Sequence, residues 1–454
     1  MKIWKYAVIV VGMIAAINYA QVSLAAISSE EAAKLGTTLT GVGAEMAGNK
    51  DGTIPPYTGG LTTPPPTFKP GSGIRPDPFE NERPLFSISA ENVEQYADKL
   101  TEGTNALIKR KPGFRIDVYK THRTVAFPES VLKNTKRNAV TATTYNGGLS
   151  VKGTRAGYPF PIPKDGYETM WNHLLSYKGR AYEYEMQGWL VPPDGRKVMT
   201  VKGHMWHEIP YYDEDTTRYD ANIYWKFRWL YTGPPRKAGE DMFVFDPINI
   251  GEEGRIVWQY LPGQRRVKLA PEIAFDTPNA GPGGANTYDD YYLFNGSMER
   301  YDFKLLGKKE IYVPYNEYKI VYMTKDINKI LGSAFVNPDV MRWELHRVWV
   351  VEGTLKKGKR HIYHKRRFYL DEDSWNIIAT ENYDGLNNLF RIGFGMEAPS
   401  YDFPAPSVEM HMFYDMIAGC YNINVWLGQG YMVGIKPFPE KYWSPDALAG
   451  RGLR

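Results

Sequence analysis

Cysteine is almost absent from this sequence, because Cys420 is the only one in 454 residues. A chain with a single thiol has no internal disulfide framework and no metal site built from several thiolates. Charge of one sign is also lacking, since 55 Lys and Arg against 51 Asp and Glu leave a formal net charge of +4. So small an excess over so long a chain excludes the strongly basic surface of a nucleic-acid-binding protein. We therefore predict no nucleic-acid partner.

Motifs of several enzyme classes are missing too. The sequence has neither the Gly-x-Ser-x-Gly elbow of many hydrolases nor a phosphate loop or a dinucleotide fingerprint. Its 8 histidines include two pairs three residues apart, His204/His207 and His361/His364. In a strand, an odd spacing turns two side chains to opposite faces. We therefore predict no metal site, no cofactor and no catalytic residue.

Long apolar runs are confined to the first residues. Lys2 and Lys5 come first, an apolar stretch covers residues 7–16, and small residues follow at Ser23-Leu24-Ala25. This pattern is typical of a secretory signal peptide, and the stretch is short for a membrane-spanning helix. We expect residues 1–25 to be removed and the mature protein to be periplasmic. A peripheral association of the mature protein with the outer membrane is compatible with this prediction.

Aromatic residues are abundant instead, with 33 Tyr, 12 Trp and 19 Phe. Aromatic side chains suit half-buried pleated surfaces, so they favour β structure. Alternating polarity between tight turns predicts an antiparallel meander with one buried and one wet face. The predicted strands cover residues 180–191, 218–231, 255–261, 265–269, 342–352, 359–370, 375–383, 408–416 and 421–427, and another begins at 197.

Helical signals are fewer. Capping boxes at Ser28/Glu31 and Asp165/Glu168 each precede an apolar stripe. The predicted helices cover residues 28–36, 89–112, 128–138, 165–175 and 324–331. Residues 26–86 are predicted to form a short helix followed by a Pro- and Gly-rich extended arm, and residues 87–454 to form a single large antiparallel β domain.

Two alternating strands suggest a ligand cavity. Tyr and Trp bring apolar bodies with polar tips, and Met adapts to irregular ligands. We predict that the cavity binds a lipid or another hydrophobic molecule and is lined by Tyr219, Trp225, Phe227, Trp229, Met410, Met412 and Tyr414. The helix at 165–175 is predicted to act as its lid or plug through Tyr167, Met170, Trp171 and Leu174.

A basic run is the most strongly charged feature. It could dock on anionic headgroups or an acidic partner, or it could be a solvated hairpin. The predicted docking residues are Lys356, Lys357, Lys359, Arg360, Lys365, Arg366 and Arg367.

Paired carboxylates leave alternatives open. Glu183 and Glu185 share a strand face, as paired acid and base groups in a glycosidase would, although a wet face that Gln187 continues is the favoured interpretation. Asp289 and Asp290 follow a Gly- and Pro-rich loop and are the best candidates for an acid. The alternatives to a carrier are therefore an exported carbohydrate-active hydrolase or sugar-binding protein, and a structural adaptor with a fully packed interior.

Several segments together resemble a bacterial family known as domain of unknown function 1329, which is grouped with the lipoprotein carriers LolA and LolB. The segments that carry this resemblance are 36–45, 51–60, 263–271, 287–290, 342–350 and 369–375. The resemblance implies an α+β, mainly β fold: a strongly curved antiparallel sheet, or incomplete barrel, with plugging helices. It also implies a periplasmic carrier that works with an inner-membrane exporter of the resistance-nodulation-division type and a companion outer-membrane protein. The chain is more than twice the size of a typical LolA-like carrier, and it lacks the acylated cysteine that anchors LolB.

Overall fold

The computed structural model describes residues 26–213, 222–279, 281–428 and 430–449. The predicted signal peptide of residues 1–25 and the predicted cavity residue Tyr219 lie outside the described residues. The strands are β1 (Phe86–Ile88), β2 (Ile116–Val118), β3 (Thr143–Tyr145), β4 (Ser150–Lys152), β5 (Ala181–Val191), β6 (Val198–Glu208), β7 (Ile223–Gly233), β8 (Asp241–Pro247), β9 (Ile256–Leu261), β10 (Arg266–Leu269), β11 (Tyr301–Pro314), β12 (Trp343–Leu355), β13 (Lys365–Asp371), β14 (Ile377–Tyr383), β15 (Leu389–Gly395), β16 (His411–Asp415), β17 (Tyr421–Trp426) and β18 (Met432–Gly434).

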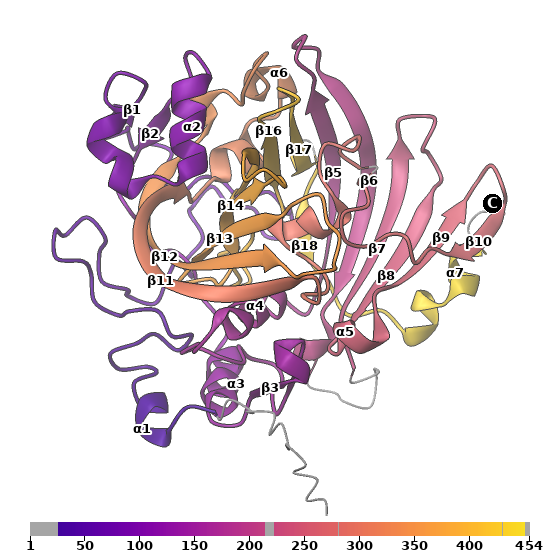
Figure 1. Cartoon of the computed structure of the whole chain (residues 1–454), viewed down its shortest axis with the longest axis horizontal. Helices are drawn as coiled ribbons and strands as arrows, with labels where there is room; N and C mark the ends of the chain where they lie inside the picture. Colours follow the sequence, from indigo (N-terminus) through magenta and orange to yellow (C-terminus); the bar gives the residue numbers. More distant parts are fainter. Residues whose placement is uncertain (1–25, 214–221, 280, 429, 450–454) are drawn as a thin grey trace, which may run out of the picture.

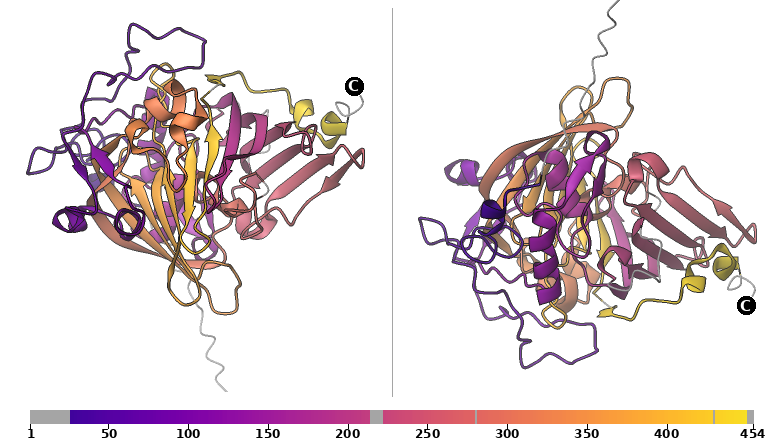
Figure 2. Two further views of the ribbon diagram at one scale, coloured as in Figure 1. Left: turned by 90° about the horizontal axis from the view of Figure 1, so that it is seen from above. Right: turned by 90° about the horizontal axis from the view of Figure 1, so that it is seen from below.

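All of these strands except β3 and β4 belong to one 16-stranded sheet, which curves through the whole molecule (Figures 1 and 2). Its order is β1-β2-β12-β13-β14-β15-β16-β17-β5-β6-β7-β8-β9-β10, with β11 paired to β12 and β18 paired to β5. The pairs are antiparallel apart from a single parallel contact between β2 and β12. The predicted large antiparallel sheet is therefore confirmed, and the sheet does not close on itself within the described part of the chain.

The α-helices are α1 (Ser29–Ala32), α2 (Glu102–Arg110), α3 (Glu129–Ala139), α4 (Gly166–Leu174), α5 (Ile250–Glu253), α6 (Ile327–Ile330) and α7 (Pro445–Ala449). Both predicted capping residues are present, since Ser28 accepts from Glu31 N–H and Asp165 accepts from Glu168 N–H. The long helix predicted over 89–112 is instead two pieces, the 3₁₀ helix η1 (Val93–Lys99) and α2, because Leu100 is extended. Among the helices that the structure describes, none is long and apolar enough to cross a membrane.

Eight of the described strands were not predicted: β1, β2, β3, β4, β8, β11, β15 and β18. The longest, β11, pairs with β12 along its whole length, but its register shifts between Leu305 and Gly307. A bulge of this kind inserts an extra residue and breaks the alternation of polar and apolar residues from which a strand is predicted. The strand predicted over 359–370 is shorter than expected, because β13 begins only at Lys365.

One face of the sheet, called the inner face below, is covered by chain segments that fold back over it. The segment of residues 271–298 crosses it and contains the short helix η4 (Tyr288–Leu293). Leu293 of η4 lies over Gly393 of β15, where an added Cβ would meet it at 2.9 Å. The first turn of α4 is equally close to β11, because a Cβ on Gly166 would meet the backbone of Phe303 at 2.5 Å. Glycine therefore allows both close approaches.

The opposite, outer face is not wet, which corrects the prediction of one solvated face. Near β15, Gly103 of α2 packs on Ile392. Near β8 and β9, the C-terminal segment with η7 (Glu440–Trp443) and α7 covers the sheet, and Trp443 joins Phe243 in a separate small core. Lys226, on the face of β7 opposite Trp225 and Phe227, donates to Glu440 at 2.9 Å and is 3% exposed. The alternation of β7 was predicted correctly, but both of its faces are covered.

The Pro- and Gly-rich segment before β1 lies along the outside of the molecule, as the indigo trace in Figure 1 shows. Side chains and backbone groups fix it at intervals. Tyr57 donates its hydroxyl to Val125 O at 2.9 Å, and Leu61 N–H donates to Thr124 O at 2.8 Å. Arg75 is fully buried and makes a paired contact with Asp402.

Candidate functional site

An aromatic row lies along β7 on the inner face. The rings of Trp225 and Phe227 stack with their centroids 5.2 Å apart, and Trp229 follows at 6.1 Å from Phe227. Tyr291 of η4 covers the row from above, 5.8 Å from the ring of Phe227. Each of these side chains is less than a tenth exposed. The row is therefore a roofed apolar compartment between the sheet and the segment 271–298.

A buried polar cluster adjoins the aromatic row. Glu409 accepts hydrogen bonds from the hydroxyls of Tyr182 and Tyr292, each at 2.9 Å. Beside it, Tyr184 and Tyr291 share a hydrogen bond of 2.8 Å between their hydroxyls. Burial raises the pKa of Glu409 above its ordinary value and the pKa of Tyr182 well above its own. Raised pKa values favour the protonated forms of these groups, in which their hydroxyls act as hydrogen-bond donors.

A buried lysine, Lys178, lies beside this cluster. It lies between α4 and β5, is 7% exposed, and donates to the hydroxyl of Ser176. Its ammonium also lies 4.8 Å from the centroid of the Tyr292 ring. Within the described residues its ammonium makes no salt bridge, although the buried carboxylates Glu409 and Glu397 attract it from farther away. Burial lowers the pKa of Lys178 to about 8 against their effect. A buried ammonium without a bonded anion is costly, which makes this lysine a marker for a ligand site.

Three cavities lie in a row from the surface to Lys178. The outermost, about 380 Å³, is bordered by α5 and by Ala274 and Gly296. The second, about 30 Å³, is lined by Trp225, Phe227 and Trp229. The third, about 20 Å³, is lined by Lys178.

Shared lining residues connect the three cavities. Arg255 lines both the outermost and the middle cavity. Trp225 and Asn295 line both the middle and the innermost cavity. The two inner cavities are each about the size needed for one water molecule. The path is therefore continuous in its walls but nearly filled by side chains, so a ligand has to displace them to enter.

The predicted cavity residues fall into two groups that the structure does not bring together. Trp225, Phe227 and Trp229 line the middle cavity on the inner face. Met412 and Tyr414 point to the outer face of β16, where the hydroxyl of Tyr414 accepts from Val336 N–H at 3.2 Å. Met410 has the same place in the alternation of that strand. The prediction that all of them line one cavity therefore needs correction, because alternation identifies two faces but not the inner one.

The predicted lid helix borders the site only at its end. Leu174 lines the innermost cavity beside Lys178. Trp171 instead donates its indole N–H to Gly148 O at 2.8 Å, and Tyr167 donates its hydroxyl to Tyr301 O at 3.0 Å. Met170 is fully buried. These contacts fix α4 to its surroundings, so the helix forms a wall of the site.

The predicted docking patch is only partly a surface. Lys357, Lys359 and Arg360 are exposed, but Arg366 is fully buried. Arg366 therefore has to be removed from the patch, because its guanidinium is bound inside the protein by Asp289 and Asp290. Among the others, the structure records ion pairs for Lys356 with Asp302, Lys359 with Glu299, and Arg367 with Glu352; Lys365 lies 4.0 Å from the ring of Tyr383.

The carboxylates proposed for a hydrolase do not meet in an open cleft. Asp289 accepts from His361 at 3.0 Å and from Arg366 at 2.9 Å. Asp290 accepts from Arg366 and from the hydroxyl of Tyr363, both at 2.8 Å. Both are buried, and Arg366 with His361 lowers the pKa of Asp289 against the effect of burial. They hold η4 against β13, a structural role.

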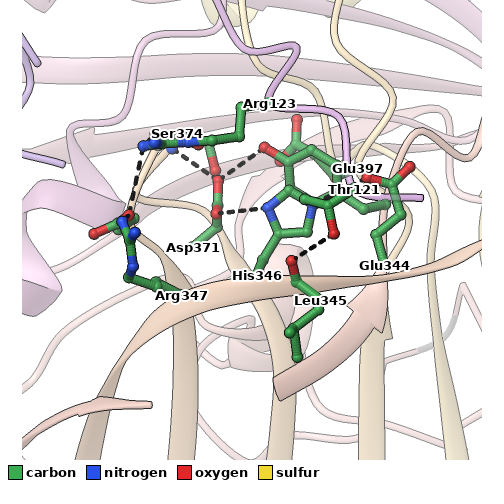
Figure 3. Close-up of polar contacts among 12 residues, drawn as sticks. Thr121, Arg123, Glu344, Leu345, His346, Arg347, Asp371, Ser374 and Glu397 are labelled. Carbon is green, nitrogen blue, oxygen red and sulfur yellow. Dashed lines mark hydrogen bonds and ion pairs between the residues drawn. The ribbon is translucent and has the colours of Figure 1, made fainter. Parts of the chain in front are cut away.

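A second buried charged cluster lies at the turn between β13 and β14 (Figure 3). His346, Asp371 and Asp373 offer ligand atoms within 4.8 Å of one another, close enough for one metal ion. However, Arg123 donates to both oxygens of Asp373, at 2.8 and 2.7 Å. Burial and the neighbouring Asp373 raise the pKa of Asp371 well above its ordinary value. The guanidinium already occupies the place of a cation, so the residues fit an ion-pair cluster better than a metal site.

The polar half of the site was not predicted. The predicted acid and base candidates on β5 were Glu183 and Glu185, whereas the inner face carries the alternate residues Tyr182 and Tyr184. The alternation of tyrosine with glutamate over residues 182–185 was the signal in the sequence that could have identified the inner face of β5. Lys178 stands in a connection between helix and strand, where no periodic pattern exists.

Comparison with known proteins settles the family. The model of the family "Protein of unknown function (DUF1329)" matches residues 87–449. The chain belongs to this family. An uncharacterized protein of Pseudomonas aeruginosa is 39% identical over 457 residues, covering 95% of each chain. The predicted family resemblance is therefore confirmed.

Solved structures with similar folds share little sequence with this chain. A putative outer membrane lipoprotein-sorting protein domain from Vibrio parahaemolyticus is 14% identical, with a TM-score of 0.40, covering 60% of this chain and 93% of its own. A DUF1329 family protein from Desulfovibrio piger is also 14% identical, with a TM-score of 0.39, and the match covers 60% of this chain and 92% of that protein. A LolA superfamily protein from Nitrosomonas europaea is 11% identical, with a TM-score of 0.34, and the match covers 60% of this chain and 94% of that protein.

Proposed function

We propose that this DUF1329 protein is a non-enzymatic periplasmic carrier that binds a hydrophobic molecule on the inner face of its sheet and passes it between membranes. The observation that carries this proposal is the row of cavities from the surface pocket beside α5, past Arg255, to the aromatic row of β7. Ligand sites are typically apolar, aromatic and closed by a few polar groups.

Side-chain movement is the proposed way in. Arg255 separates the outer cavity from the aromatic one, and it is held by Asp246 through two hydrogen bonds of 2.7 Å. The segment 271–298 supplies the other wall, and much of it is irregular chain without strand pairing to the inner face. Irregular segments with little sheet pairing open at lower cost than paired strands. We propose that the part of this segment before η4 swings away when the ligand enters, while η4 stays tied to β13 through Arg366.

The proposed partners follow from the family resemblance. They are an inner-membrane exporter of the resistance-nodulation-division type and a companion outer-membrane protein. The exposed basic residues Lys357, Lys359 and Arg360 form the proposed docking surface for an acidic partner or for anionic headgroups. Their side chains stand on a hairpin remote in sequence from the cavity-lining segments.

Native mass spectrometry tests the carrier proposal first. Protein isolated from the periplasm should carry a stoichiometric extra mass, and solvent extraction should release an apolar compound that accounts for it. Binding of the neutral dye Nile red to the extracted protein provides the quantitative assay.

A matched pair of variants locates the dye. Ala274→Trp fills the outer cavity, so we expect dye affinity to fall about tenfold, which is about 1.4 kcal/mol of binding free energy. Thr354→Trp adds the same side chain at an exposed position of β12 and should leave dye affinity unchanged. Equal dye binding by the wild type and both variants would show that the dye binds elsewhere.

A further inference from the structure

The innermost cavity is chemically different from the aromatic cavity beside it. The aromatic cavity is lined mainly by apolar side chains of β7 and β8, including Phe227, Trp229 and Val244. The innermost cavity is lined by the hydroxyl-bearing Ser176 and Tyr292 and by the ammonium of Lys178. Trp225 and Asn295 form the wall common to both. An apolar compartment therefore ends directly at a polar one that holds a cation.

We propose that the ligand is a long-chain monocarboxylic acid, whose carboxylate pairs with Lys178 while its apolar chain lies along Trp225, Phe227 and Trp229. This inference rests on the proposed carrier function and names the class of its ligand. It follows from the juxtaposition of an apolar cavity with a buried ammonium that makes no salt bridge within the described residues and is attracted by Glu409 and Glu397 only from farther away.

The charge at the inner end selects a carboxylate over a phosphate. A phosphate monoester carries close to two negative charges at neutral pH and is best held by several donors from arginine. Lys178 supplies a single positive charge as a compact ammonium. The nearest arginine along the row, Arg255, is already bound to Asp246. A single ammonium without a salt bridge within the described residues matches one monovalent anion.

Neighbouring ionisable groups are compatible with an anion at this place. Glu409 is hydrogen-bonded by Tyr182 and Tyr292, and burial raises its pKa, which favours the neutral acid. Glu397 is bound by Asn376 and Ser407 N–H, and burial raises its pKa as well.

The two histidines near Lys178 stay neutral. Both ring nitrogens of His173 are occupied, one by Phe294 O and the other by Ile377 N–H. Burial and Lys178 lower the pKa values of His173 and His207. Among the described groups that face this cavity, Lys178 therefore supplies the positive charge.

The test compares an acid with its neutral ester on the extracted full-length mature protein. Hexadecanoic acid and methyl hexadecanoate have the same chain, and each is titrated by displacement of Nile red. The wild type should bind the acid about tenfold to a hundredfold more tightly, as expected for hydrogen bonds to a charged group. Lys178→Met should remove this preference and leave the ester affinity unchanged, while Lys357→Met, the same change at an exposed site, should keep it.

The possible outcomes separate the inference from the function it rests on. Equal affinity of the wild type for acid and ester, or a preference that survives in Lys178→Met, overturns the carboxylate proposal. If the wild type binds neither probe nor Nile red, the carrier proposal fails instead. If Lys178→Met does not fold, the ratio of acid affinity to ester affinity in the wild type is measured over a range of pH instead. The preference for the acid should decline as the pH rises through about 8, where Lys178 loses its proton. The affinity for the ester should stay constant.

Discussion

Arg366 on β13 donates to Asp290 on η4 at 2.8 Å, and both side chains are fully buried. A second donor of the same guanidinium reaches Asp289 at 2.9 Å. Residues more than seventy positions apart in sequence thereby tie the segment 271–298 to the centre of the sheet. These ion pairs hold η4, whose Tyr291 and Tyr292 border the two inner cavities, while Ala274, earlier in the segment, borders the outermost cavity.

Replacing Arg366 by Met should lower the free energy of unfolding by about 3–5 kcal/mol, because two buried carboxylates lose their partner. Urea unfolding followed by tryptophan fluorescence measures the change. Lys357→Met, an identical substitution at an exposed site, is the control and should alter stability by less than about 0.5 kcal/mol. A loss below about 1 kcal/mol in Arg366→Met would mean that the pair is not formed as described.

Arg123 should exclude metal ions from the cluster of His346, Asp371 and Asp373. Zinc is therefore expected to leave the melting temperature of the wild type unchanged. Arg123→Ala should be less stable by about 3–5 kcal/mol, and zinc should recover part of this loss because histidine and carboxylate ligands become available. The double variant Arg123→Ala/His346→Ala should not respond to zinc. A zinc-dependent rise in the wild type would contradict the ion-pair interpretation.

His173 should contribute to acid unfolding. Burial lowers its pKa to about 3 from an ordinary 6.5, so the unfolded chain takes up the proton first as pH falls. Stability is then complete above about pH 6.5 and is lost progressively as the pH falls toward 3, with a slope of up to about 1.4 kcal/mol per pH unit.

His173→Gln should remove one such proton from the pH dependence of unfolding. His411, whose pKa burial lowers to about 4, titrates in the same window and keeps part of the slope. The matched control is His364→Gln at an exposed position. Urea unfolding at a series of pH values measures the slopes, and identical slopes for all three proteins would refute the assignment.

The C-terminal segment should be a local unfolding unit. Trp443 is 3% exposed and contacts Phe243, with ring centroids 5.4 Å apart. Trp443→Ala should increase protease cleavage within residues 435–449 several-fold, because the segment loses its main apolar anchor while the sheet stays paired. Trp343→Ala, at an equally buried indole within the sheet, should instead lower global stability by about 3–5 kcal/mol. Equal cleavage of the segment in both variants would argue against a local unit.

Local patterns predicted the sheet well where strands are regular. The alternation of Trp225, Phe227 and Trp229 identified β7 and one of its faces, and the Asp165/Glu168 capping box identified the start of α4. The bulge at Gly307 hid the longest strand, because the alternation changes phase there. Sequence periodicity describes single elements and fails where an element is irregular.

Long-range packing could not be predicted in the same way. Nothing local distinguishes Met412 and Tyr414 on the outer face from Trp225 on the inner face, because the distinction depends on which segments cover the sheet. Lys178 lies outside any periodic element. The site around its ammonium is formed by residues distant in sequence, such as Tyr292 and Glu409. The charged run at 356–367 gave no sign that Arg366 is buried, because its partners precede it by more than seventy residues.

The junction of β17 with β5 also has a consequence for the order of biogenesis. Ile423 pairs with Trp189, so the two halves of the sheet become one only when nearly the whole chain has been synthesised. Until then, β5 and β16 each keep an open edge of unpaired backbone groups, which is a risk for aggregation. Late closure therefore delays the compact state of the sheet until its last strands are available.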